Sequence, residues 1–134
     1  MKVFLDSCFL IYLNVVTDSE ESERLHSFYL DLLKHELYIN MLIIDETLYI
    51  SKKKYNLNYN ITLNFLEENI LPFVEVIPIE RKDFKLMKQF LLKYNLKPSD
   101  ALHLATMSKI GCNTIITEDK EFDKTHIKRI WPFK

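Results

Sequence analysis

Glycine is almost missing from this sequence, since Gly111 is the only one among 134 residues, where average usage predicts about nine. Phosphate-binding loops of the P-loop and dinucleotide-binding kinds require at least two glycines at a fixed spacing. Both classes of nucleotide-binding protein are therefore excluded. An excess of one charge is missing too, because 19 acidic side chains face 18 lysines and arginines and leave a net charge of -1. This balance excludes a polycationic protein that binds nucleic acid through bulk charge.

Cysteine is also scarce, and Cys8 and Cys112 are the only two. Two cysteines provide neither a disulfide framework nor a C-x-x-C pair for zinc or redox chemistry. No apolar run is long enough to span a bilayer, and Asp6 stands where a secretory signal requires apolar residues. We therefore expect a cytoplasmic protein without a membrane segment.

Strand and helix patterns alternate along the chain without a linker, a repeat or a low-complexity segment, so we expect a single domain over residues 1–134. Short apolar runs predict strands at residues 3–5, 37–43, 73–79, 114–116 and 127–130. Apolar residues at helical spacing predict helices over residues 7–16, 20–33, 44–55, 61–69, 84–94 and 98–110. This alternation implies an α/β fold with a mainly parallel sheet of four to five strands.

A few residues predict where the helices begin and end. Thr17-x-x-Glu20 has the pattern of a capping box, and Ser99, after Pro98, is the expected N-cap of the last long helix. Gly111 is placed to end that helix with a positive φ angle. Pro72 cannot continue the helix over residues 61–69, which must end before it.

Four acidic residues lie near the predicted exit ends of the strands. Asp6 directly follows the first strand, Glu46 lies in the first turns of the helix after the second, and Asp119 lies just past the fourth. Asp100 opens the helix that leads into the fourth strand, so that end of the helix must lie near the exit edge. Ligands bind at this edge in parallel α/β sheets. We therefore expect the four carboxylates to converge there.

A cluster of carboxylates is stable only if ionisation is suppressed or a cation is bound, because like charges repel. Mg²⁺ and Mn²⁺ are hard ions that take oxygen ligands. Such ions suit phosphodiester hydrolysis, since they help to ionise the attacking water and stabilise the leaving oxygen. The sequence shows no competing histidine or cysteine cluster for zinc.

The segments VFLDSCFLIYL, IIDETLYI, PSDALHLA and TIITEDKEF resemble, in order and spacing, the four acidic motifs of the PIN domain family. The resemblance covers nearly the whole chain. It implies a three-layer α/β/α fold and a metal-dependent endoribonuclease that uses Mg²⁺ or Mn²⁺ to hydrolyse RNA. Short stand-alone members are mostly toxins of the VapC type, so it also implies a partner antitoxin and a homodimer.

Matched by position, the metal-binding and catalytic acids are Asp6, Glu46, Asp100 and Asp119. In this interpretation the three aspartates hold the ion, while Glu46 is either a further ligand or positions the attacking water. Thr117 matches the hydroxyl residue that commonly stands two positions before the last acid.

Two positions depart from the family pattern or extend it. Cys8 stands where asparagine or serine is usual, two residues after the first acid. Metal affinity can change there while the fold is kept. Asp123 falls where some relatives carry a further acid. It either reaches a second metal ion or is a solvated loop residue.

Each of these residues also has an ordinary structural interpretation. Isolated acids commonly cap helices or complement their dipoles, and two neighbouring acids, Asp45 and Glu118, compete with the family assignment. His103 lies three residues after Asp100, where it can orient a carboxylate or contact RNA, although such a histidine more often packs as a structural residue. The run Lys52, Lys53 and Lys54 either holds RNA phosphates or complements a helix C-terminus.

Two other functions compete with the nuclease. A PIN fold with weak or no catalysis can serve as an RNA-binding or partner-binding module, and Cys8 gives this alternative some weight. A phospho-receiver domain also places acids at strand exits. It requires an acidic pair after the first strand and an aspartate after the third, and the sequence has neither.

Overall fold

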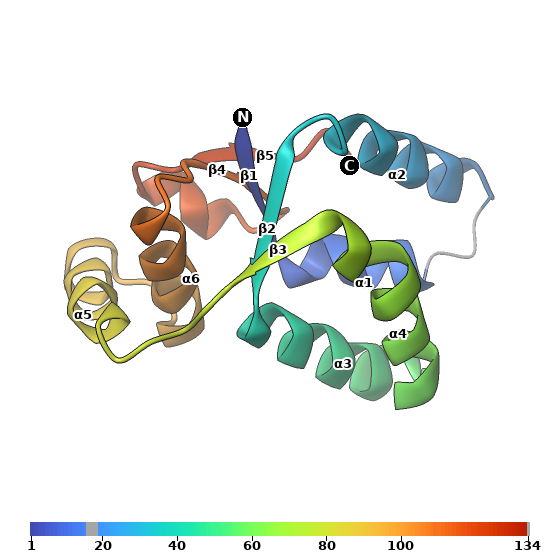
Figure 1. Cartoon of the computed structure of the whole chain (residues 1–134), viewed down its shortest axis with the longest axis horizontal. Helices are drawn as coiled ribbons and strands as arrows, with labels where there is room; N and C mark the ends of the chain where they lie inside the picture. The colour runs from blue at the N-terminus through green and yellow to red at the C-terminus, as the bar shows by residue number, and fades with distance from the viewer. Residues whose placement is uncertain (16–18, 134) are drawn as a thin grey trace.

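The apolar run at residues 3–5 forms the centre of a five-stranded parallel sheet in the computed structural model, which describes residues 1–15 and 19–133 (Figure 1). The strands are β1 (Lys2–Leu5), β2 (Glu36–Asn40), β3 (Val74–Ile77), β4 (Thr114–Ile116) and β5 (Lys128–Ile130). Their order is β3-β2-β1-β4-β5, and every neighbouring pair is parallel. The predicted parallel α/β fold is confirmed.

Helices cover both faces of this sheet. They are α1 (Ser7–Val15), α2 (Ser19–Leu32), α3 (Met41–Tyr55), α4 (Tyr59–Phe65), α5 (Asp83–Tyr94) and α6 (Pro98–Lys109), with short helical turns η1 (Leu66–Ile70), η2 (Leu71–Phe73) and η3 (Lys120–Lys124). The chain moves from β1 to β3 in one direction and then returns to β4. Because such crossovers are right-handed, α1–α4 lie on one face and α5 and α6 on the other, which gives three layers (Figure 1).

The core lies where the central strands meet these two helical layers. Val3, Phe4 and Leu5 of β1 are all fully buried, as are Ile115 and Ile116 of β4. Strands buried on both faces carry continuous apolar runs rather than alternating ones. Each large side chain buried in this way stabilises the fold by roughly 2 kcal/mol.

The two central strands end at the topological switch point of the sheet. From β1 the chain crosses towards β2, whereas β4, on the other side of β1, is reached from α6. The backbone N–H of Asp6 donates to the carbonyl of Ile116 at 3.1 Å, which brings Asp6 and Thr117 side by side. A crevice at such a switch point is the usual ligand site of an open α/β sheet.

The second strand is shorter than predicted. β2 ends at Asn40, so residues 41–43 are the first turn of α3 instead of the end of a strand. The cause is a cap, because the Asn40 side-chain oxygen accepts a hydrogen bond from the N–H of Ile43 at 3.0 Å. The third strand is likewise shorter than residues 73–79.

The start of α6 also corrects a prediction. Ser99 is not the N-cap. Lys97 holds that position in extended conformation and makes no side-chain cap bond, and Pro98 is the first helical residue. Proline forces the residue before it out of helical conformation and itself suits the first turn. Gly111 has the predicted positive φ, at 68°.

The remaining boundaries agree more closely with the sequence. The helix predicted over 61–69 is α4, extended by the single turn η1 as far as Ile70, before Pro72. The capping box at Thr17 lies outside the described residues. Within the part of the chain that the structure describes, no helix has both the length and the apolarity to cross a membrane.

Candidate metal centre

Asp6 lies at the centre of the switch-point crevice, held by hydrogen bonds to both carboxylate oxygens. The backbone N–H of Ser7 donates to Oδ1 at 2.9 Å, and the Thr117 hydroxyl donates to Oδ2 at 2.6 Å. Asp6 is only 7% exposed. This burial raises the pKa of its carboxyl, although the nearby His103 and the Thr117 hydrogen bond oppose the shift. The side chain is therefore fixed in direction and poorly solvated.

Thr117 and Cys8 surround this carboxylate. The Thr117 hydroxyl, fully buried, also accepts from the backbone N–H of Asp119 at 3.1 Å, so it links the ends of β1 and β4. Cys8 Sγ lies 3.4 Å from that hydroxyl and 3.9 Å from Asp6 Oδ2. Burial and the neighbouring Asp6 raise the pKa of the Cys8 thiol to about 12. The thiol thus stays protonated at neutral pH and acts as a weak donor towards Asp6.

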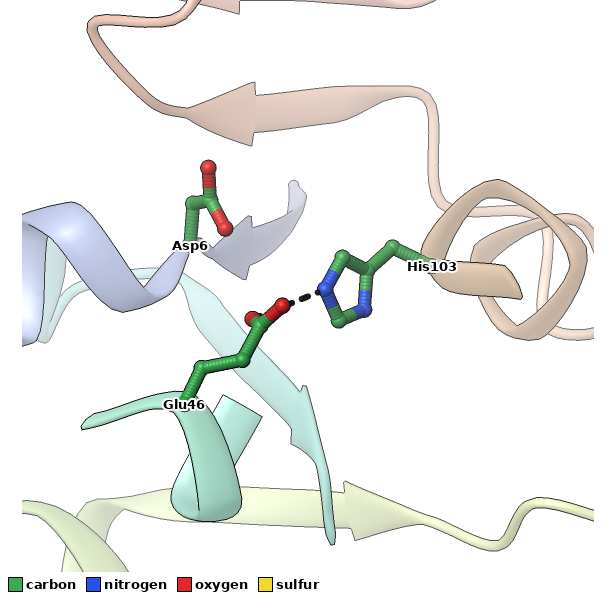
Figure 2. Close-up of side chains that lie close together, drawn as sticks. All are labelled: Asp6, Glu46 and His103. Atoms are coloured by element: carbon green, nitrogen blue, oxygen red, sulfur yellow. Dashed lines mark hydrogen bonds and ion pairs between the residues drawn. The ribbon is translucent and has the colours of Figure 1, made fainter. Parts of the chain in front are cut away.

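Glu46 approaches Asp6 from α3, on the opposite side of the crevice (Figure 2). Its Oε1 lies 3.1 Å from Nε2 of His103, which comes from α6 and is fully buried. One ligand atom from each of Asp6, Glu46 and His103 lies within 4.8 Å of the other two. The neighbouring Asp45 is exposed and lies away from this group.

Asp100 and Asp119 reach the same crevice from α6 and from the segment after β4. Asp100 is 8% exposed, and burial followed by the charge of Asp6 raises the pKa of its carboxyl to about 6. Asp119 is half-buried and caps η3, where its Oδ1 accepts from the N–H of Glu121 at 3.0 Å. The four acids predicted from the sequence line one cavity of about 450 Å³.

The other predicted residues lie around this cavity. Asp123 is exposed and forms a two-pronged ion pair with Arg129, at 2.9 and 3.2 Å, and it does not line the cavity. Lys52, Lys53 and Lys54 are exposed, and their ammonium groups lie 5.0 to 5.7 Å from the ring centres of three different tyrosines.

Two polar residues at the site had no distinct signal in the sequence. The amide nitrogen of Asn40 donates to the Thr106 hydroxyl at 3.0 Å and lies 3.1 Å from Nδ1 of His103, behind the carboxylates. Tyr12 donates its hydroxyl to Glu118 at 2.7 Å, at the rim of the cavity. A strand-end asparagine suggests a helix cap, but neither contact can be inferred from spacing.

The donor set of the cavity fits a hard divalent cation. Asp6, Asp100 and Asp119 converge there, and among the described residues no lysine or arginine forms an ion pair with any of the three. Buried carboxylates without a cation are costly. Oxygen ligands of this kind are those that Mg²⁺ and Mn²⁺ prefer.

Several solved structures share this fold. A chain of the Rickettsia felis VapBC2 complex, bound to a fragment of its promoter DNA, aligns with a TM-score of 0.71 and 16% identity over 98% of both chains. FitAcB from Neisseria gonorrhoeae aligns with a TM-score of 0.74 and 18% identity over 96% of both chains. Mycobacterium tuberculosis VapC20, described as a toxin that cleaves the sarcin-ricin loop, aligns with a TM-score of 0.69 and 15% identity, over 90% of this chain and 92% of VapC20.

Sequence comparison identifies the family directly. No curated protein matches the chain. The sequence model of the PIN domain family matches residues 3–128, a span that includes all four acids of the cavity. The chain therefore belongs to the PIN domain family.

Proposed function

We propose that this protein is an endoribonuclease that hydrolyses RNA phosphodiester bonds with Mg²⁺ or Mn²⁺ bound in the acidic cavity. The observation that carries the proposal is the set of four carboxylates that line one cavity, with the pKa values of Asp6 and Asp100 raised mainly by burial. Perturbed acids gathered in a crevice are typical of functional sites.

Each acid has a distinct part in this proposal. Asp6, Asp100 and Asp119 hold the ion, and Glu46 either adds a ligand or positions the attacking water. Thr117 keeps Asp6 in place through its 2.6 Å hydrogen bond. A bound ion would help to ionise the water and would offset negative charge on the phosphate oxygens.

Asp123 is proposed to support the chain beside the site and not to bind the metal ion. Its carboxylate holds Arg129, whose Nη1 lies 3.3 Å from the carbonyl of Thr117. The Arg129 hydrogen bonds lower the pKa of Asp123, so this acid is already paired with a cation. We propose that the pair stabilises the chain beside the site.

The RNA strand is proposed to leave the cavity along α3. A second cavity of about 170 Å³ shares Cys8, Ile50 and Glu118 with the acidic cavity and is also lined by Tyr12 and Lys54. Lysine next to aromatic rings suits a single strand, since the ammonium group contacts phosphates and the rings stack on bases.

A toxin–antitoxin role is supported by what is known of the solved structures that share this fold. VapBC2, which shares it, is bound to a DNA fragment from its promoter, and VapC20 is described as a toxin that cleaves the sarcin-ricin loop. We propose that this chain acts on cytoplasmic RNA as a homodimer and is restrained by an antitoxin. A neighbouring gene for a small DNA-binding protein would support this part of the proposal.

The test is cleavage of labelled RNA by protein freed of contaminating nuclease. Mg²⁺ or Mn²⁺ is expected to support cleavage, Ca²⁺ to support it poorly because of its longer and looser coordination, and EDTA to abolish it. Undiminished cleavage in excess EDTA would overturn the metal mechanism.

Cys8 favours one alternative, a PIN fold that binds RNA or a partner with weak or no catalysis. Its protonated thiol is a weaker donor to Asp6 than an amide or hydroxyl would be. Calorimetric titration with Mn²⁺ separates the two functions, since a protein that only binds RNA need not bind the ion. A Cys8→Asn variant with higher activity than wild type would identify the thiol as the weakness.

A further inference from the structure

Two buried side chains and Glu46, which lines the cavity, form a hydrogen-bonded relay. Asn40 at the end of β2 and His103 on α6 are both fully buried, and the Glu46 side chain is 22% exposed. Asn40 Nδ2 lies 3.1 Å from His103 Nδ1. On the other side of the ring, His103 Nε2 lies 3.1 Å from Glu46 Oε1, the contact drawn as a dashed line in Figure 2. The ring of Phe4 packs against the imidazole, with ring centres 5.5 Å apart. The relay therefore joins three elements through one imidazole.

The orientation of the Asn40 amide is fixed at both of its ends. Its oxygen accepts from the N–H of Ile43, the capping bond of α3, at 3.0 Å. Its nitrogen faces the hydroxyl of Thr106 at 3.0 Å, and that hydroxyl already donates its hydrogen to the His103 carbonyl. A flipped amide would point its nitrogen at a donor N–H and lose the cap. The amino group of Asn40 is thus the group that faces His103.

This orientation selects one tautomer of His103. Because an N–H of Asn40 points at Nδ1, that nitrogen must accept and carries no hydrogen. The hydrogen of the neutral ring is then on Nε2, which donates to Glu46 Oε1. A histidine whose second nitrogen is engaged in this way is held in both tautomer and ring orientation.

We infer that Asn40 and His103 are positioning residues for Glu46. Asn40 sets the Nε2–H tautomer, and His103 holds one oxygen of Glu46 so that the carboxylate faces Asp6 across the cavity. The inference rests on the proposed function for its catalytic meaning, but the relay itself stands on hydrogen-bond geometry.

The relay also assigns His103 a role that differs from metal ligation. Its Nε2 lies in the group of atoms within 4.8 Å that can surround an ion. A ligand nitrogen must be unprotonated, so ligation by Nε2 would move the hydrogen to Nδ1, against the Asn40 amide. Turning that amide to accept would break the capping bond to Ile43. The ion is therefore left with oxygen ligands, which favours Mg²⁺ and Mn²⁺ over softer ions.

The tautomer is read directly by NMR of the ring nitrogens in the intact, metal-free protein. The chain has 4 histidines, and a His103→Gln variant identifies the His103 signals by their loss. We expect Nε2–H in wild type. Asn40→Asp keeps the capping oxygen but places an acceptor opposite Nδ1, so a hydrogen should appear on Nδ1 in that variant. A hydrogen on Nδ1 already in wild type would overturn the inference.

Two variants of His103 separate positioning from packing. His103→Gln keeps a donor near the position of Nε2, whereas His103→Leu fills the space without one. We expect Leu to weaken Mn²⁺ binding, measured by calorimetry, by about 10- to 100-fold, and Gln to recover most of that loss. Equal affinities for both variants, after their melting temperatures confirm folding, would show that the imidazole only packs.

Addition of Mg²⁺ to the NMR sample tests the ligand alternative, because direct coordination would remove the hydrogen from Nε2. The same experiments distinguish this inference from the nuclease proposal. A wild-type protein with the expected tautomer and the Gln-over-Leu order of Mn²⁺ affinity, but without RNA cleavage, would refute the function and leave the positioning role standing.

Discussion

The molecule contains two clusters of carboxylates that differ in whether a lysine forms ion pairs with them. Between α5 and α6, Glu80 and the buried Asp83 share one cation, since Lys109 Nζ lies 3.0 Å from an oxygen of each. The hydrogen bond from Lys109 lowers the pKa of Glu80. Burial alone would lower the pKa of Lys109, but hydrogen bonds to Asp83 and Glu80 outweigh it and raise that pKa.

The switch-point cavity has more acids, and the lysine that lines it, Lys97, forms no ion pair with them in the part of the chain that the structure describes. Burial raises the pKa of Asp6 and of Asp100, which is the reverse of the shift at Glu80. The fold therefore pairs the carboxylates of the first cluster with a lysine, whereas no lysine or arginine of the described residues forms an ion pair with the three aspartates of the cavity. A site built in this way favours an ion from solution.

The largest expected effect comes from removing charge at the cavity. Asp100→Asn and Asp119→Asn keep the side-chain shape but remove a ligand charge, so each should lower Mn²⁺-dependent RNA cleavage by orders of magnitude. Without metal, both should be at least as stable as wild type, because like charges repel less. Mn²⁺ should raise the melting temperature of wild type more than that of either variant.

The exposed Asp123 offers a matched control for these variants. Asp123 lies four residues after Asp119 and is paired with Arg129. The Asp123→Asn variant should therefore retain the wild-type shift of the melting temperature on addition of Mn²⁺. If Asp100→Asn and Asp119→Asn also gave wild-type shifts, neither aspartate would belong to the metal site.

Breaking the other cluster should affect stability but not metal binding. Lys109→Met leaves Asp83, which is 1% exposed, without its cation, and removal of one partner of such a buried pair costs about 3 kcal/mol. Urea denaturation measures this loss, and calorimetry should show unchanged Mn²⁺ affinity. Lys124→Met, which removes an exposed pair with Glu121, is the control and should cost less than about 1 kcal/mol.

The two clusters should also respond to pH with opposite signs. Because the folded state raises the pKa of Asp100 from 3.8 to about 6, folded protein binds more protons than unfolded protein in that window. The contribution of Asp100 to the free energy of unfolding therefore decreases as pH rises from about 4 to 6 and then levels off. Glu80, whose pKa is lowered, contributes stability that is lost as pH falls.

Denaturation in EDTA across this pH range tests the assignment. The difference in stability between wild type and Asp100→Asn should grow in favour of the variant as pH rises to about 6. A difference that does not change with pH would mean that Asp100 titrates at its ordinary value.

Much of the fold was predictable because strands and helices that are buried carry regular patterns of apolar residues in the sequence. β1 and β4 are buried on both faces, so their sequences are continuous apolar runs that predict strands directly. The convergence of the acids followed from chain direction alone, since parallel strands share one exit edge. Asp100 was placed correctly by this argument, at the N-terminal end of the helix before β4.

What could not be predicted depends on contacts between distant side chains. Asn40 ends β2 early because its own side chain caps α3. The largely apolar sequence of residues 37–43 predicts a continuous strand and gives no sign that a helix begins within it. The partner of Asn40 in the relay, His103, is 63 residues away. A histidine at that spacing from Asp100 has an ordinary structural interpretation, and only the position of α3 relative to α6 brings it to Glu46.

The lysine run shows how a helix separates neighbours in sequence. Successive residues of an α-helix point about 100° apart, so Lys52, Lys53 and Lys54 face different surroundings. Lys52 lies over the ring of Tyr59, whereas Lys54 lines the cavity that adjoins the acidic site. Among the three lysines of this run, Lys54 is therefore the one that lies beside the acidic cavity.

The smallest expected effect concerns this lysine, a cation beside the acids that forms no ion pair with them among the described residues. Replacing Lys52, Lys53 and Lys54 with glutamine should weaken RNA binding, flatten its salt dependence and change stability little. Lys54→Gln alone should remove most of that effect, a change of roughly 0.7 in the slope of log affinity against log salt for one single-strand phosphate contact.

Lys52→Gln is the matched control and should bind as wild type does. Fluorescence anisotropy at several salt concentrations, in an Asp119→Asn background that does not cleave, measures both slopes. Equal slopes for the two single variants would place the RNA away from the cavity beside α3.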